Sequence, residues 1–141
     1  FLAYASIHGG TAAVANLMAE ILREKGAKKV SVADLSRDDM AEAIEDAFRM
    51  DKMIVAAASY DGGVFPVMHD FLHHLQIKAY QKRRVGIIEN GSWAPCAGRV
   101  MRGMLEQMKD VEIAEPMVTI LSRMKQSDRA TLEALADAIL K

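Results

Sequence analysis

Several things that this chain of 141 residues lacks narrow what it can be. It has a single cysteine, Cys96, which excludes an internal disulfide framework and fits a reducing compartment such as the cytoplasm. Acidic and basic residues nearly balance, so the basic excess that accompanies nucleic-acid binding is absent. No apolar run approaches the roughly 20 residues of a membrane span, and there is no signal-peptide pattern. We therefore expect one globular domain, large enough to bury a core without disulfide or metal staples.

Two common nucleotide-binding signatures are also missing. The loop Ser6-Ile7-His8-Gly9-Gly10-Thr11 contains no lysine and is not a Walker A loop, and the chain has no G-x-G-x-x-G. This loop nevertheless joins an apolar strand, residues 1–5, to an amphipathic helix. Backbone N–H groups and the positive end of the helix dipole then point at one spot, which predicts a phosphate there. The alternative is an ordinary turn capped by Thr11, with His8 as a surface residue.

What the sequence does contain is a regular alternation of strand and helix patterns. Apolar strand runs occur at residues 1–5, 29–33, 53–58, 84–88 and 111–121, and each is followed by apolar residues at helical spacing. This alternation predicts a doubly wound α/β domain, a three-layer sandwich around a five-stranded parallel sheet. Right-handed crossovers leave few strand orders. We expect the flavodoxin-like order 2-1-3-4-5, with Pro116 marking the fifth strand as an edge.

In such sheets a ligand binds at the carboxyl ends of the strands, beside the switch point between the first and third strands. The loops after strands one, three and four meet there, and they are the glycine-rich loops of this chain. Residues 59–63 carry Tyr60, and residues 90–96 carry Trp93, the only tryptophan. Two aromatic side chains beside an anion site predict a planar ring attached to a phosphate. The alternatives are packing roles for Trp93 and Cys96 and a turn-forming role for Asp61.

These loops resemble segments of one protein family. Residues 6–11 resemble the flavodoxin phosphate loop, S/T-x-x-G-N/S-T, although asparagine is commoner where Gly10 stands. Residues 57–66 resemble the S-P-T-x-N-N-G-x-F-P segment of the flavodiiron proteins, and Gly91-Ser92-Trp93 resembles their G-S-Y/W loop. The resemblance to their flavodoxin-like domain covers essentially all 141 residues. Asp61 and Gly62 stand where asparagines are usual, and Pro95 stands where many members carry a second tryptophan.

The resemblance implies a bound FMN and gives each loop a part of it. Around the phosphate it places Ser6, Ile7, His8, Gly9, Gly10 and Thr11. Along or beside the isoalloxazine ring it places Ser59, Tyr60, Asp61, Gly62, Gly63, Asn90, Gly91, Ser92, Trp93 and Cys96. We expect no acid, base, nucleophile or metal ligand within the domain, because its task would be to hold FMN and set its potentials.

The resemblance also implies partners. Electrons would come from a donor such as a rubredoxin or a reductase and pass to a di-iron centre that reduces oxygen or nitric oxide in an upstream domain. Phe1 already lies within a strand pattern, so we expect the domain to be the C-terminal part of a longer chain. A homo-oligomer stays open.

Other functions stay open at this point. An NAD(P)H-dependent quinone or flavin reductase has the same fold but needs a nicotinamide pocket, for which the sequence has no feature. A phosphorylation-controlled receiver domain needs an aspartate at the end of the third strand, where Ala57-Ala58-Ser59 stands. A flavodoxin-like module without cofactor is the third alternative.

Two groups of charged or titratable side chains lie outside these loops. His69 and His73 have metal-pair spacing without a third ligand, so we expect a solvated helix face. Lys82-Arg83-Arg84 is expected to form a solvated turn.

Overall fold

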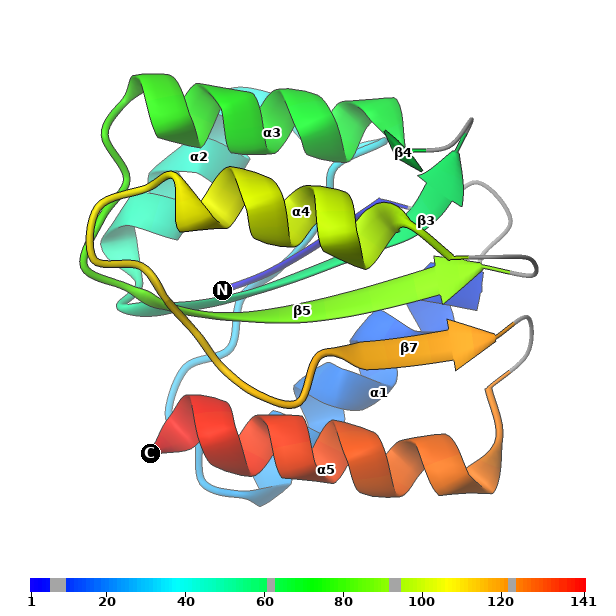
Figure 1. Cartoon of the computed structure of the whole chain (residues 1–141). Coiled ribbons are helices and arrows are strands. Elements are labelled where there is room, and N and C mark those ends of the chain that lie inside the picture. The colour runs from blue at the N-terminus through cyan, green and yellow to red at the C-terminus, as the bar shows by residue number, and fades with distance from the viewer. Residues whose placement is uncertain (6–9, 61–62, 92–94, 122–123) are drawn as a thin grey trace.

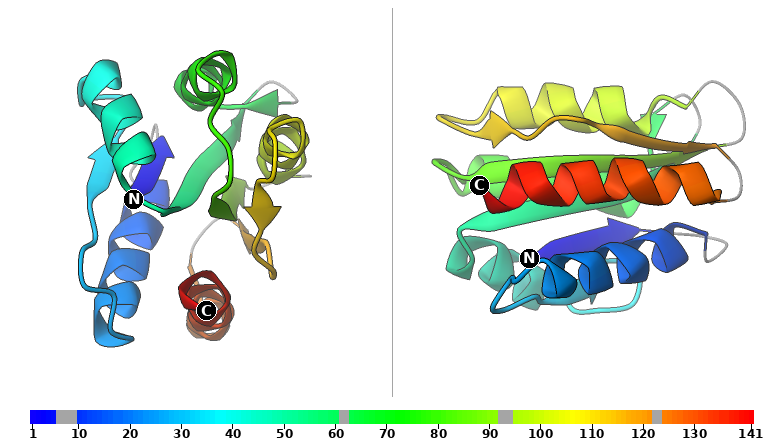
Figure 2. Two further views of the ribbon diagram at one scale, coloured as in Figure 1. Left: turned by 90° about the vertical axis from the view of Figure 1, so that its left-hand side faces the viewer. Right: turned by 90° about the horizontal axis from the view of Figure 1, so that it is seen from below.

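The computed structural model describes residues 1–5, 10–60, 63–91, 95–121 and 124–141, with helices on both sides of a central sheet (Figures 1 and 2). In chain order the elements are β1 (Leu2–Ala5), α1 (Gly10–Glu24), β2 (Val32–Asp34), α2 (Met40–Arg49), β3 (Lys52–Tyr60), β4 (Gly63–Val64), α3 (Pro66–Ile77), β5 (Arg84–Gly91), α4 (Ala97–Glu106), β6 (Glu112–Ile113), β7 (Val118–Leu121) and α5 (Gln126–Leu140). None of the helices in these ranges has the length and apolarity needed to cross a bilayer.

The sheet confirms the predicted doubly wound topology and adds detail to it. Its order is β2-β1-β3-β5-β6, and β7 also pairs with β5, so β6 and β7 together take the place of the predicted fifth strand. That strand is interrupted by Pro116, which has no N–H for the ladder. The prediction missed β4, which pairs antiparallel with β3. Apart from this hairpin, every described strand pair is parallel.

The core has two halves because β3 and its neighbours are covered on both faces. Helices α2, α3 and α4 lie on one face, and α1 and α5 lie on the other (Figure 1). Side chains of β3 alternate between the two halves, with Val55 and Ala57 on the α2–α4 side and Ile54 and Ala56 on the α1–α5 side. A strand buried on both faces explains the continuous apolar run that predicted it.

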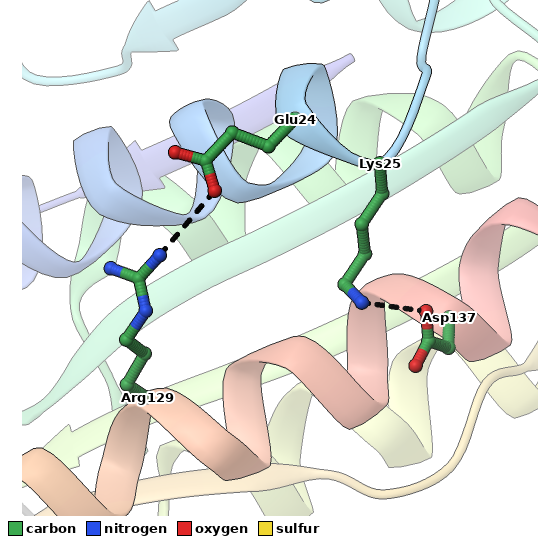
Figure 3. Close-up of polar contacts among 4 residues, drawn as sticks. All are labelled: Glu24, Lys25, Arg129 and Asp137. Carbon is green, nitrogen blue, oxygen red and sulfur yellow. Dashed lines mark hydrogen bonds and ion pairs between the residues drawn. The ribbon is translucent and has the colours of Figure 1, made fainter.

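Helices α1 and α5 are also joined on the surface, by the two ion pairs drawn in Figure 3. Arg129 of α5 lies 3.4 Å from the Glu24 carboxylate, and the Lys25 ammonium lies 2.9 Å from the Asp137 carboxylate. Both carboxylates are more than half exposed, so these pairs contribute little to stability individually.

The segment Lys82-Arg83-Arg84 is not the solvated turn that we expected. Arg83 donates hydrogen bonds to the carbonyl oxygens of Phe48 and Met50, at 2.9 and 3.0 Å, where α2 ends. Arg84 donates to the carbonyl oxygen of Lys141, at 2.7 Å, where α5 ends. Only Lys82 of the three is fully exposed. The arginine side chains therefore bind helix C-termini, where cations are favoured.

Candidate functional site

The strands that lead into the three predicted segments lie side by side. Strands β1, β3 and β5 are neighbours, and the register pairs Ala5 with Ala57 and Ala57 with Glu89. Segments that follow these strands therefore share the carboxyl edge of the sheet. The predicted residues that lie outside the described ones are Ser6, Ile7, His8, Gly9, Asp61, Gly62, Ser92 and Trp93.

The N-terminus of α1 lies at this edge and carries no internal acceptor in the described part of the chain. The helix begins at Gly10, its first turn has no acidic residue, and no described side chain accepts a hydrogen bond from that turn's N–H groups. Thr11 is buried, and its Oγ1 lies 3.5 Å from Nδ2 of Asn90. A Cβ added at Gly10 would lie 3.1 Å from the same Nδ2. The described residues at the start of α1 thus bring no negative charge to it, which favours an anion there.

The second predicted segment is a tight hairpin rather than the loop expected at residues 59–63. Strand β3 runs to Tyr60, which pairs with Gly63, and Ser59 pairs with Val64. The hairpin brings Gly63 back beside β3, at the edge where the other two segments end. Glycines between two short strands are typical of a β-hairpin, so Gly62 and Gly63 were a signal for it. We interpreted them as part of a loop instead.

Ser59 has a role that sequence reasoning missed. Its Oγ accepts hydrogen bonds from the backbone N–H groups of Cys96, at 2.8 Å, and Ala97, at 3.1 Å. The hydroxyl therefore caps α4 from a different element of the fold. The Cys96 thiol, partly exposed, lies 3.3 Å from the carbonyl oxygen of Gly63 and so joins the hairpin to the same helix start.

Glu89 is the second residue that sequence reasoning missed. The predicted strand ended at residue 88, but Glu89 lies within β5 and only 5% of it is exposed. One carboxylate oxygen accepts from the Gly98 N–H at 2.9 Å, and the other accepts from the Thr119 hydroxyl at 2.7 Å. An acidic residue directly after a buried apolar run was the available signal. Together with Ser59, Glu89 satisfies three successive N–H groups at the start of α4.

The third predicted segment is shorter than expected, because β5 continues through Asn90 to Gly91 and α4 begins at Ala97. Gly91 lies close to its surroundings, since a Cβ there would be 3.3 Å from Cβ of Pro95 and 3.5 Å from Oγ of Ser59. Asn90 and Gly91 thus belong to the end of β5, and Pro95 packs closely against Gly91.

Asp34 and its neighbours form the outer part of this edge. The Asp34 carboxylate at the end of β2 accepts from the Ser36 N–H at 3.0 Å and lies 3.8 Å from Arg37. Burial raises the pKa of the Tyr4 phenol, and the neighbouring Asp34 carboxylate raises it further, so the phenol stays neutral.

The histidines of α3 lie apart from this site. His69, His73 and His74 are exposed, and the rings of His69 and His73 are stacked with centroids 6.4 Å apart. Among the residues that the structure describes, no group of three His, Cys, Asp or Glu side chains is placed to hold a metal ion.

Comparisons with known proteins agree on the fold. No family model matches the chain, and no curated protein matches its sequence. Among solved structures, it is similar to rubredoxin oxygen:oxidoreductase from Desulfovibrio gigas, with a TM-score of 0.92, 18% identity and 98% of this chain covered. It is also similar to a mutant flavo-di-iron protein from Thermotoga maritima, with a TM-score of 0.81, 22% identity and 99% of this chain covered. A flavodoxin from Streptococcus pneumoniae has a TM-score of 0.82 and 23% identity, again with 99% of this chain covered.

The lengths of these matches differ. The chain covers 95% of the S. pneumoniae flavodoxin but 34% of each of the other two proteins. It therefore corresponds to a whole flavodoxin and to about a third of a flavodiiron protein. By its fold the chain is a flavodoxin-like domain.

Proposed function

We propose that the chain is an FMN-binding electron-transfer domain. One observation carries the proposal: at the carboxyl edge, the N-terminus of α1 is free of internal acceptors among the described residues, whereas the N-terminus of α4 is filled by Ser59 and Glu89. A phosphate would therefore bind at α1, at the switch point between β1 and β3.

The described residues fit this group. The backbone N–H groups of Gly10 and Thr11 would donate to the phosphate, with the Asn90 amide beside them. The Ser59–Tyr60 end of β3, Gly63, Gly91 and Cys96 would border the ring. The assignments of residues 6–9, 61–62 and 92–93 remain predictions from the sequence. FMN supplies one- and two-electron transfer when it is bound, and the chain positions it and sets its potential.

A finer proposal concerns the partners. The similarity to two flavodiiron proteins, each matched over about a third of its length, supports a domain that serves a di-iron centre in an upstream domain. The donor would be a rubredoxin or a reductase, as the name of the D. gigas protein suggests for that protein. We propose the cytoplasm as the compartment, in keeping with the single cysteine.

The cofactor proposal is tested by the absorption spectrum and flavin content of the purified domain. We expect a yellow protein with one FMN per chain, or a colourless one that takes up FMN on reconstitution. Riboflavin, which lacks the phosphate, is the matched ligand and should bind at least about a hundredfold more weakly. A chain that cannot take up FMN contradicts the proposal, and equal affinity for riboflavin contradicts the assignment of α1.

The donor proposal is tested separately, by rapid mixing of the FMN-loaded domain with reduced rubredoxin. Bleaching of the flavin absorbance at a rate that rises with rubredoxin concentration is expected. No reduction by rubredoxin, in a domain that a flavin reductase does reduce, would favour the reductase as donor.

A further inference from the structure

We propose that Glu89 is a positioning residue for the flavin site: its carboxylate ties the end of β5, at Asn90 and Gly91, to the start of α4 and lowers the reduction potential of the FMN that these residues would border. The inference rests on the proposed FMN binding. Glu89 is buried and is not among the residues proposed to contact FMN.

The first step is the pair of contacts that the carboxylate makes. Glu89 directly precedes residues 90–97 in the chain, and Gly98 directly follows them. The 2.9 Å hydrogen bond from the Gly98 N–H to the Glu89 carboxylate therefore joins the end of β5 to the start of α4. The second oxygen accepts from the Thr119 hydroxyl of β7 at 2.7 Å, which holds the carboxylate in one orientation. Charge-assisted bonds of this kind are among the strong ones in proteins.

The second step is the fit around this contact. A Cβ added at Gly98 would lie 2.8 Å from Cδ of Glu89 and 2.7 Å from Sδ of Met117. Carbon atoms do not approach so closely, so the contact requires a glycine at this helix position. Ala97, Met101 and Leu105 pack α4 into the core. At the helix start, Glu89 and Ser59 add the acceptors for the backbone N–H groups that packing alone does not satisfy.

The third step is the charge. Glu89 is 5% exposed, and no Lys or Arg in the described ranges forms an ion pair with it. Its negative charge is offset only in part by the dipole of α4. Charges act more strongly in the protein interior than in water. Asn90 and Gly91, the next residues of β5, would border the flavin ring. The negative charge of Glu89 would therefore oppose the addition of an electron to the ring, and so lower the reduction potential of FMN.

The test compares Glu89→Gln with Glu89→Ala. Gln keeps the shape, can accept from Gly98 and can donate to Thr119, but it removes the charge. We expect Glu89→Gln to bind FMN within about threefold of wild type and to have a higher midpoint potential. Glu89→Ala leaves the Gly98 N–H unpaired, and we expect its FMN dissociation constant to rise about tenfold or more, with an altered flavin absorption band. Glu20→Gln, an exposed residue of α1, is the matched control for charge.

The outcomes separate the two proposals. A wild-type chain that takes up no FMN contradicts the proposed function and this inference with it. If wild type binds FMN but the midpoint potential of Glu89→Gln equals that of Glu20→Gln, the effect of charge is refuted. If folded Glu89→Ala binds FMN as wild type does, with the same spectrum, Glu89 only stabilises the fold. Should Glu89→Ala fail to fold, Gly98→Ala disturbs the same contact from the helix side and should weaken FMN binding in the same direction.

Discussion

Helices α1 and α4 begin at the same edge of the sheet, yet their N-termini are treated in opposite ways. At α4, Ser59 and Glu89 accept hydrogen bonds from three successive N–H groups. At α1, no described side chain accepts from the first turn, which contains no acidic residue. Among the described residues, internal acceptors are thus found at one of these two helix starts and not at the other.

The difference extends to how each helix is held. Half-buried Ser59 of β3 and buried Glu89 of β5 accept hydrogen bonds at the start of α4, whereas at the far end of α1 surface ion pairs to α5 add to the packing of its buried face (Figure 3). Together with the proposed function, the comparison predicts that an anion binds at α1 and not at α4, whose start already has internal acceptors. Four changes test it, taken from the largest expected effect to the smallest.

The largest effect should come from closing the start of α1 with a carboxylate. Gly10 is exposed at the first position of the helix, and Gly10→Asp would place a negative charge where the phosphate is proposed to bind. We expect FMN affinity to fall about a hundredfold, while the melting temperature of the FMN-free protein stays the same or rises, because an acidic residue there favours the helix dipole. Both are measured by fluorescence titration and thermal unfolding.

Gly10→Asn is the matched neutral control, since it brings the same Cβ to within 3.1 Å of the Asn90 amide. It should bind FMN within about threefold of wild type. If Gly10→Asn weakens binding as much as Gly10→Asp does, the loss is steric and the proposed anion site at α1 is not supported.

The second change opens the start of α4. Ser59→Ala removes the acceptor for the N–H groups of Cys96 and Ala97, and we expect the free energy of unfolding to fall by about 1–2 kcal/mol. Chemical denaturation of the FMN-free protein measures it, with Ser36→Ala, an exposed serine, as control. A loss no larger than in the control would show that water replaces Ser59 without cost.

The third change removes the polar neighbour of α1. The Asn90 amide lies 3.5 Å from the Thr11 hydroxyl, a long contact, so Asn90→Ala should change unfolding free energy by less than about 0.5 kcal/mol. We expect FMN affinity to fall about fivefold, or roughly 1 kcal/mol, because one donor near the phosphate is lost. Asn16→Ala, on the exposed side of α1, is the control. A large loss of stability with unchanged affinity would assign Asn90 a purely structural role.

The smallest effect should come from the surface ion pairs. Asp137→Asn removes the partner of Lys25, but Asp137 also lies in the last turn of α5, where a negative charge is unfavourable. The two effects oppose each other, so we expect the unfolding free energy to change by less than about 0.5 kcal/mol and the difference to shrink in high salt. A loss several times larger would mean that α1 depends on α5 more than its exposed contacts indicate.

The fold could be predicted because its signals are local. The buried run at residues 53–58 and the helical spacing after each strand follow from the number of faces that each element buries, and Pro116 marked an edge. The extent of β5 and the hairpin at Tyr60 and Gly63 were missed, because both depend on pairing with a neighbouring strand.

The site could be predicted only as a set of segments. The meeting of the segments after β1, β3 and β5 follows from topology. The roles of Ser59 and Glu89 do not, because Ser59 contacts a helix start 37 residues away and Glu89 contacts Thr119 30 residues away. The acidic residue directly after an apolar run marked Glu89 as unusual, but no local pattern reports its distant partners, and a serine in a polar segment predicts exposure.

The arginines at the opposite edge have a consequence for the rate at which a ligand arrives. Every helix of this fold begins at the carboxyl edge and ends at the amino edge, where Arg83 and Arg84 bind the ends of α2 and α5. Their guanidinium groups offset the negative helix ends there, while the positive start of α1 has no described acidic side chain in its first turn. The described starts of α2 and α5 carry the acidic residues Asp39, Glu42 and Asp128, so the field that would draw a phosphate ester is local to the start of α1. The association rate of the ester should fall as salt shortens the reach of that field, to about 8 Å at physiological ionic strength.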